Sequence, residues 1–197
     1  MTVRVMLVSP AMTVDLREAR FGGLGPLDES GVRAAAAAVH DVPRADLVLR
    51  GSSLRCRETA EALGLRAEAV EALADWHIGD WSGRTLAEVG ESEPEALALW
   101  LRDPAAAPHG GESLRQLSVR MGQWLESLPP LRVLAVVEPA VVRAVTVVAL
   151  GLAPEVFWRL DVGPLTLTEL SGRQGRWNLR CGRPLGGAGS QAVAGTP

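Results

Sequence analysis

Three segments of the sequence place polar side chains directly after apolar runs that read as buried strands. They carry Ser9 with Pro10, Arg55 and Glu138. In open α/β sheets, ligands bind beyond the carboxyl ends of the strands, so we expect these residues to meet at one edge of a sheet. A guanidinium there would bind an anion. A carboxylate would serve as a general acid or base, or would pair with the guanidinium.

The elements that must position these residues follow from hydrophobic patterning and from capping residues. The predicted strands are 3–8, 46–49, a weaker 67–73, 131–137, and a hairpin of 165–170 and 176–181. The predicted helices are 30–39 capped by Ser30, 54–63 capped by Ser53, 84–90, 93–102, 113–127 and 139–150. Residues 14–29 are expected to form a loop.

Strands that alternate with helices indicate an α/β fold, a three-layer sandwich around a mostly parallel central sheet. We expect residues 1–184 to form a single domain. Residues 185–197, which are rich in Gly and Ala and contain no aromatic residue, are expected to be a disordered tail.

Composition excludes several classes of function. The 197-residue chain has a net charge of −3, and all 20 of its basic residues are arginine. It has no basic stripe for nucleic acid, no lysine for Schiff-base chemistry, and no apolar run long enough to span a membrane. Cys56 and Cys181 are too few for a zinc site or a disulfide framework, so we expect no metal and no cofactor. We expect a cytoplasmic protein, because no signal-peptide pattern precedes the first strand.

Five segments resemble, in the same order, the motifs of the histidine phosphatase (phosphoglycerate mutase-like) superfamily. Residues 6–13 lie where that family has a strand followed by Arg-His-Gly-x-Thr, and residues 55–60 look like its Arg-Ala-x-x-Thr-Ala helix start. Residues 73–83 resemble its Leu-x-Glu-x-x-Phe-Gly-x-Trp-x-Gly loop, 110–113 its Gly-Gly-Glu-Ser motif, and 136–143 its Val-Ser-His-Gly-Gly-Val-Ile-Arg segment. The order of the five implies the phosphoglycerate mutase-like fold.

The catalytic residues of the family carry over only in part. The resemblance implies a nucleophilic His, a flanking Arg and a second His, and here these positions hold Pro10, Ser9 and Glu138. The second-helix Arg is retained as Arg55, and Asp75 stands at the position of the acid that protonates the leaving oxygen. Because proline has no side-chain nitrogen, we expect no phosphohistidine.

Charge also disfavours phosphate in the inferred pocket. Two unit charges 4 Å apart interact by about 4 kcal/mol near a protein surface, so repulsion by Glu138 offsets the attraction of Arg55 for a phosphoryl dianion. An unpaired buried guanidinium is costly. We therefore expect an Arg55–Glu138 ion pair that closes the old phosphate site from within.

Further side chains are candidates for ligand contact. They are Ser9, Thr13, Trp76 and His109, with Trp81 as a second tryptophan of the same loop. Capping and turn duties explain the two hydroxyl residues equally well, and wall packing explains most tryptophans.

The histidines, Cys56 and Arg143 are further candidates for a role in chemistry. None of His40, His77 and His109 occupies a catalytic position of the family, although His77 or His109 could line the cleft and replace the nucleophile. Cys56 reads as a small buried hydrophobe, or as a thiol whose pKa Arg55 lowers. Arg143 is expected to have a packing or surface role.

Three functional hypotheses remain open. The first is a member of the family that is unable to act through phosphohistidine and is kept as a binding, regulatory or partner protein. The second is an enzyme that uses Glu138 and Asp75 as acid and base on a small metabolite. The third is residual phosphatase activity. A small-molecule ligand or a protein partner is expected, with no nucleic acid and no membrane, and the resemblance makes a homodimer plausible.

Overall fold

The protein is described by a computed structural model over residues 2–23, 25–173 and 175–186. Its strands are β1 (Val3–Val8), β2 (Leu47–Arg50), β3 (Glu68–Ala69), β4 (Arg132–Val136), β5 (Thr166–Arg173) and β6 (Arg176–Pro184). Its α-helices are α1 (Val14–Arg17), α2 (Glu29–Ala37), α3 (Leu54–Ala62), α4 (Leu86–Ser92), α5 (Pro94–Arg102), α6 (Leu114–Ser127) and α7 (Pro139–Ala149).

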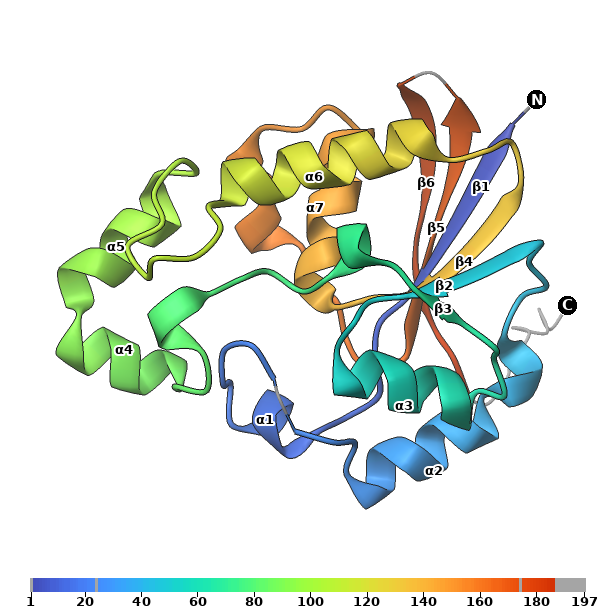
Figure 1. Cartoon of the computed structure of the whole chain (residues 1–197), viewed down its shortest axis with the longest axis horizontal. Helices are drawn as coiled ribbons and strands as arrows, with labels where there is room; N and C mark the ends of the chain where they lie inside the picture. The colour runs from blue at the N-terminus through green and yellow to red at the C-terminus, as the bar shows by residue number, and fades with distance from the viewer. Residues whose placement is uncertain (1, 24, 174, 187–197) are drawn as a thin grey trace, which may run out of the picture.

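The strands form one sheet in the order β3-β2-β4-β1-β5-β6. β1 runs parallel to β4, and β2 runs parallel to both β4 and β3, whereas β5 is antiparallel to β1 and to β6. Helices α2 and α3 lie on one side of the sheet and α6 and α7 on the other, while α4 and α5 extend beyond it (Figure 1). The predicted α/β sandwich with a mostly parallel sheet is confirmed.

Both faces of the central strands are buried, which explains why β1 is apolar throughout rather than alternating. Val5 and Leu7 pack into the core shared with α6 and α7. Met6 and Val8 point to the opposite face, where they join a second core with Ala35 of α2 and residues of α3. β1 is therefore held rigidly between two layers, and its carboxyl end has a fixed position.

The carboxyl ends of three strands meet at one edge of the sheet. Val8 of β1 pairs with Val136 of β4, and Arg50 of β2 pairs with Val136 on the other side. The backbone N–H of Val137 donates to the carbonyl of Val8 at 2.9 Å. The residues that follow these strands therefore leave the sheet side by side, as the sequence predicted.

Local capping chemistry starts the helices that follow these strands. The hydroxyl of Ser53 accepts from the N–H of Cys56 and begins α3, and Pro139 occupies the first turn of α7. Both starts were predicted. The cap of α2 is Asp28 rather than Ser30, because the Asp28 carboxylate accepts from the N–H of Gly31 at 2.7 Å.

Two predicted loop or tail assignments are wrong in part. The expected loop 14–29 contains the short helix α1, which Thr13 caps. The expected tail begins two residues too early, because Leu185 is buried and its N–H donates to the carbonyl of Leu165 at 2.8 Å. Residues 187–197 lie outside the described ranges.

No helix in the described ranges is both long enough and apolar enough to cross a lipid bilayer.

Candidate functional site

The guanidinium of Arg55 and the carboxylate of Glu138 form a buried ion pair. Nε of Arg55 donates to Oε1 of Glu138 at 2.8 Å, and Nη2 of Arg55 contacts Oε2. Glu138 is 1 % exposed and Arg55 is 8 % exposed. α3 begins with Arg55 in its first turn, and Glu138 directly precedes α7, so the two neighbouring strand ends bring these side chains together. The predicted ion pair is confirmed.

The surroundings of Glu138 complete this arrangement. The Ser53 hydroxyl donates to Oε1 at 2.6 Å, and the Cys56 sulfur lies 3.5 Å from the same oxygen. Burial lowers the pKa of Arg55, but attraction and hydrogen bonding to Glu138 outweigh it, so the net pKa is raised. The guanidinium of Arg55 therefore stays protonated.

Two alternatives were open for Cys56, a small buried hydrophobe or a reactive thiolate, and the structure supports the first. Its side chain is fully buried. Burial, followed by repulsion from Glu138, raises the pKa of the thiol well above its usual value. A neutral thiol is a poor nucleophile, so the alternative of a thiolate activated by Arg55 is wrong.

Asp75 lies next to this pair. Its Oδ2 is 3.8 Å from Nη2 of Arg55, and its Oδ1 accepts from the N–H of Trp76 at 2.7 Å. Burial, and then repulsion by Glu138, raises the pKa of Asp75 to about 7, although Arg55 pulls it down. Near neutral pH this carboxyl group can give up or take up a proton.

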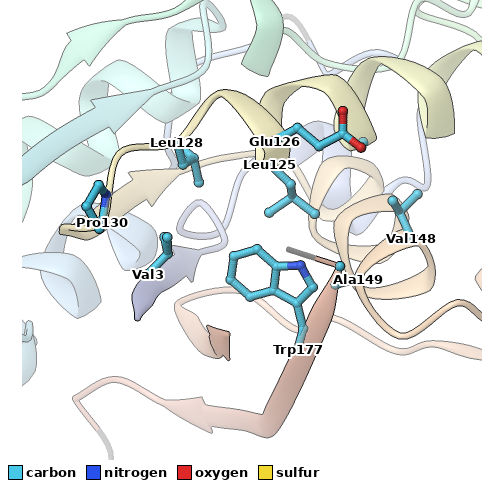
Figure 2. Close-up of a pocket in the computed structure, with 10 residues that line it drawn as sticks. Val3, Leu125, Glu126, Leu128, Pro130, Val148, Ala149 and Trp177 are labelled. Atoms are coloured by element: carbon cyan, nitrogen blue, oxygen red, sulfur yellow. The ribbon is translucent and has the colours of Figure 1, made fainter. Parts of the chain in front are cut away.

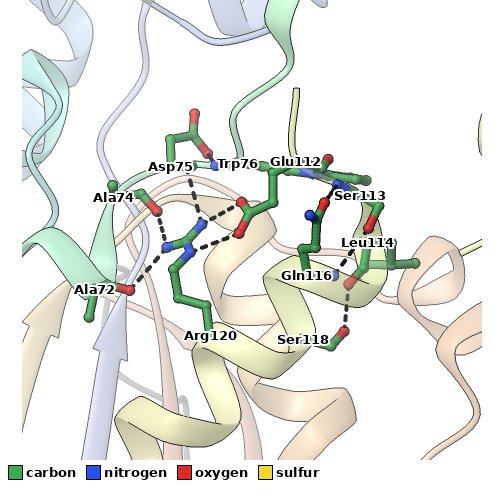
Figure 3. Close-up of polar contacts among 10 residues, drawn as sticks. All are labelled: Ala72, Ala74, Asp75, Trp76, Glu112, Ser113, Leu114, Gln116, Ser118 and Arg120. Carbon is green, nitrogen blue, oxygen red and sulfur yellow. Dashed lines mark hydrogen bonds and ion pairs between the residues drawn. The ribbon is translucent and has the colours of Figure 1, made fainter. Parts of the chain in front are cut away.

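An arginine of α6 fixes the loop that carries Asp75. Arg120 donates to the carbonyls of Ala72 and Ala74 at 3.0 and 2.9 Å, and it also reaches the carbonyl of Asp75 (Figure 3). Its other edge forms a bidentate pair with Glu112 at 2.9 and 2.7 Å. Arg120 therefore joins the Asp75 loop to the Gly-Gly-Glu-Ser motif at 110–113.

Backbone contact between the same two segments requires glycine. The N–H of Glu112 donates to the carbonyl of His77 at 2.7 Å. A Cβ on Gly111 would lie 2.0 Å from that carbonyl oxygen, and a Cβ on Gly79 would lie 2.0 Å from the carbonyl oxygen of His109. The two glycines thus let the loop of Asp75 and Trp76 rest directly on the Gly-Gly-Glu-Ser segment.

A cavity of about 360 Å³ opens beside Arg55 and Asp75. Its walls include five aromatic side chains that come from distant parts of the chain: Phe21, Trp76, Trp100, Phe157 and Trp158. Trp76 stacks on Trp100 with ring centroids 5.0 Å apart, and its Nε1 donates to the carbonyl of Glu112 at 2.6 Å. Arg143, Pro139 and Ala140 of α7 close another side.

The predicted site residues divide into two groups. Arg55, Asp75 and Trp76 line the cavity, and Glu138 lies behind Arg55. Ser9, Thr13 and His109 do not line it in the described part of the chain. The predicted acid–base pair is thereby separated, since only Asp75 reaches the cavity.

The two hydroxyl residues have structural duties. Ser9 is fully buried, and its Oγ donates to the carbonyl of Gly163 at 2.6 Å. Thr13 is fully buried and caps α1 by accepting from the N–H of Leu16 at 3.1 Å. Both hydroxyl groups form hydrogen bonds within the fold after the end of β1, so neither is exposed to a ligand.

His109 is buried among tryptophans. Its Nδ1 accepts from the N–H of Gly111 at 3.0 Å, which leaves the proton of the neutral ring on Nε2. The ring packs against Trp81, centroid to centroid 5.2 Å, and burial lowers its pKa. Trp81 itself is fully buried, so the expectation that it contacts a ligand is wrong.

Sequence reasoning missed two residues of the site. Arg143 borders the cavity although we expected a packing or surface role for it, and its place at the end of the 136–143 segment was the available signal. Arg120 lies on a helical face beside Trp124, and an isolated arginine on an amphipathic helix is usually solvated. One signal was available. Arg120 lies one turn beyond Gln116, on the helix that begins directly after the Gly-Gly-Glu-Ser motif, and so it is near that motif.

A larger apolar groove of about 640 Å³ lies at the amino end of the strands, lined among others by Val3, Leu125, Leu128, Val148 and Trp177. The Trp177 indole projects between Val3 and Ala149 (Figure 2). Glu126 is the one ionisable residue among those lining it in the described ranges. The groove therefore lacks the chemistry of the Arg55 site.

Some known proteins with similar sequences are named as phosphatases. The chain is 32% identical over 136 residues to glucosyl-3-phosphoglycerate phosphatase of Mycolicibacterium vanbaalenii, covering 61% of this chain and 60% of that protein. It is 37% identical over 100 residues to the enzyme of the same name from Mycobacterium tuberculosis, covering 48% and 45%. The chain thus aligns with 60% or less of the length of these two relatives.

Solved structures share the fold over nearly the whole chain. The structure of mycobacterial glucosyl-3-phosphoglycerate phosphatase superposes with a TM-score of 0.77 at 26% identity, covering 91% of this chain and 97% of that one. A putative α-ribazole-5'-P phosphatase from Escherichia coli superposes with a TM-score of 0.80 at 21% identity, covering 90% and 94%. The latter likeness shows the fold alone.

The sequence profile of the histidine phosphatase superfamily (branch 1) matches residues 13–182. The matched range contains α3 with Arg55, the Asp75 loop and the Gly-Gly-Glu-Ser motif, and it begins after Pro10. The chain belongs to the histidine phosphatase superfamily.

Proposed function

We propose that this protein binds a small ligand or a protein partner, and that it does not transfer phosphoryl groups through a phosphohistidine. The observation that carries the proposal is the ion pair between Arg55 and Glu138. The cation at the position that the family uses for phosphate is already neutralised inside the fold.

The end of β1 supports the proposal. Pro10 stands there, and its side chain has no lone pair with which to attack phosphorus. The profile of the family matches from residue 13 onward, so the segment that carries Pro10 lies outside the matched range. Among the described residues, no histidine lines the cavity beside Arg55.

Electrostatics support it further. A phosphate dianion at Arg55 would have to displace Glu138 or lie against it, and repulsion between unit charges 4 Å apart is about 4 kcal/mol at an effective dielectric of 20. Ionised Asp75, 3.8 Å from the same guanidinium, would add to the repulsion. One paired arginine cannot supply the fixed positive charge on which phosphoryl transfer depends.

Phosphate release provides the direct test. The protein is incubated with glucosyl-3-phosphoglycerate, which the names of its relatives indicate as their substrate, and with 4-nitrophenyl phosphate. A mycobacterial relative serves as the positive control. We expect no release above background and no labelled histidine after an alkaline quench with a ³²P-labelled ester.

Variants separate true turnover from contamination. Arg55→Lys alters the residue at the position that the family uses to bind phosphate. Arg57→Ala is the control, because it removes an exposed arginine of the same helix. Turnover that falls in the Arg55 variant and persists in the Arg57 variant would overturn the proposal. It would also favour the third hypothesis, residual phosphatase activity.

A second candidate function is acid–base catalysis on a small, non-phosphorylated metabolite. Asp75 favours it, because its pKa of about 7 and its place on the cavity wall suit proton transfer. Glu138 is the weaker half of that hypothesis, since its carboxylate is buried behind Arg55. Incubation with a metabolite extract, followed by mass spectrometry, should then show a product that the Asp75→Asn variant does not form.

The predicted single domain over residues 1–184 and the homodimer stay predictions.

A further inference from the structure

One guanidinium of the cavity lacks a carboxylate partner. Nε of Arg143 is buried and makes no hydrogen bond, and the ring centroid of Phe157 lies 5.8 Å from the guanidinium carbon. Across the described residues, no carboxylate oxygen lies within 4 Å of its nitrogens. Burial lowers the pKa of Arg143, and the more distant Asp161 opposes this shift. An arginine remains charged in proteins, so this cation needs an anion.

The other guanidiniums of the cavity already have anions. Arg55 is paired with Glu138, and Arg20 forms an ion pair with Glu18 at 2.7 Å. Arg143 is therefore the arginine of the cavity left to bind an external anion.

Apart from its arginines and Asp75, the cavity is lined mainly by apolar side chains. The aromatic walls include Trp76 and Trp158, whose ring centroids are 5.8 Å apart. Leu16, Leu86 and Leu101 line the same cavity although they are 36%, 46% and 45% exposed. Large apolar side chains gathered on a surface around a cavity mark a binding site for an apolar body.

We infer that the cavity binds a small monocarboxylate with an aromatic or branched apolar body, its carboxylate on Arg143 and its body against Trp76 and Trp158. This inference rests on the proposed function, because it takes the cavity as a binding site. A carboxylate carries one charge and fits the planar guanidinium fork. A phosphomonoester carries nearly two charges and would find one unpaired cation beside Asp75. A volume of about 360 Å³ lies at the small end of the range for ligand sites, so the body is no larger than one or two rings.

Three probes with a common body test the inference. They are 3-phenylpropanoate, its neutral amide, and 2-phenylethyl phosphate, titrated into the full chain at pH 6.5 and followed by calorimetry or by tryptophan fluorescence. We expect the carboxylate to bind about tenfold or more tightly than the amide and more tightly than the phosphate, since hydrogen bonds to a charged group are worth that much.

Two variants test the role of Arg143. Arg143→Gln should weaken carboxylate binding by about tenfold or more and leave the amide unchanged, and Arg143→Lys should restore part of the loss. Arg57→Ala is the control. A thermal unfolding profile confirms that each variant is folded. If Arg143→Gln does not fold, the comparison of carboxylate with amide in the native chain decides alone.

Each outcome has one meaning. Equal affinity for carboxylate and amide, or no binding of the carboxylate, overturns the inference and leaves the proposed function standing. Tightest binding of the phosphate ester also overturns the inference. Hydrolysis of that ester overturns the proposed function as well, and phosphate release measured in the same samples distinguishes the two failures.

Discussion

The carboxylate of Glu138 lies against the guanidinium of Arg55, beyond the paired carboxyl ends of β4 and β2. Oε1 of Glu138 accepts from Nε of Arg55 at 2.8 Å and from the Ser53 hydroxyl at 2.6 Å. The protein thus supplies its own anion to the retained arginine. The following predictions depend on that pair and on the loops that surround it.

Glu138→Gln should lower the free energy of unfolding by about 3 kcal/mol, because the buried guanidinium of Arg55 then has only the Asp75 carboxylate, 3.8 Å away, to balance its charge. Urea titration measures the change. Glu61→Gln on α3 removes an exposed carboxylate that is 3.8 Å from Arg57 and should change stability by no more than about 0.5 kcal/mol. A loss below about 1 kcal/mol for Glu138→Gln would show that the pair is open to water.

The double variant Arg55→Met with Glu138→Leu should be more stable than either single variant. Apolar side chains in place of a whole buried ion pair are often neutral or stabilising, whereas removal of one partner is costly. A double-mutant cycle by urea titration measures the coupling. Losses that simply add would contradict the arrangement described.

Asp75→Asn should flatten the dependence of stability on pH between about 4 and 7. The pKa of Asp75 rises from its ordinary 3.8 to about 7 in the fold. Between these values the folded chain holds a proton that the unfolded chain has released, so stability is full at low pH and falls as pH rises through 7. The expected loss is on the order of 4 kcal/mol, because each of the roughly three units between the two pKa values is worth about 1.4 kcal/mol.

Asparagine keeps the oxygen that accepts from the N–H of Trp76 but cannot ionise. The variant should therefore be more stable than the native chain at pH 8 and similar at pH 4, as measured by urea titration at each pH. Asp28 and Asp46, whose pKa values are lowered to about 2, affect stability only at lower pH and do not obscure this window. Parallel pH profiles for the two proteins would refute the raised pKa.

Arg120→Gln should destabilise the protein by about 2 kcal/mol and loosen the loop that carries Asp75. The substitution removes the bidentate pair with Glu112 and leaves the carbonyls of Ala72 and Ala74 without their donor. Hydrogen exchange should become faster for amides in 74–80. Arg115→Gln, an exposed position on the same helix, should leave exchange unchanged, and equal effects of both substitutions would argue against the clamp.

Gly111→Ala should destabilise the chain by about 3 kcal/mol or more, because the added Cβ would collide with the carbonyl oxygen of His77. Gly90→Ala is the matched control. Its Cβ would meet only the Leu97 side chain at 3.6 Å, and in α4 alanine should stabilise by up to about 1 kcal/mol. Thermal unfolding of both variants provides the measurement, and a tolerated Gly111→Ala would show that the two loops do not touch.

Local signals in the sequence predicted most of the fold. The apolar run of β1, the Ser53 cap of α3 and the proline that begins α7 depend on neighbours in the chain, and they are found where expected. The short helix that begins after Thr13 was missed because its four residues include no buried side chain and hence no apolar period.

The site was predicted less completely, because its walls come from segments far apart. The pair of Arg55 with Glu138 followed from two strand ends and charge balance. The place of Arg143 depends on Phe157, which lies in a 3₁₀ helix at 154–159 that the sequence did not indicate. Local sequence left the role of Ser9 open between ligand contact and a structural duty for the same reason, since its partner Gly163 is a long-range neighbour.

The pairing of Arg55 with Glu138 also constrains how such a chain can change over generations. A substitution at either position leaves a buried charge without its partner and lowers the fraction of folded protein. On the proposed function, a return to histidine chemistry would need replacements at Ser9, Pro10 and Glu138 together. The ion pair thus links two positions that are 83 residues apart in the sequence, and a change at one is tolerated only when the other changes with it.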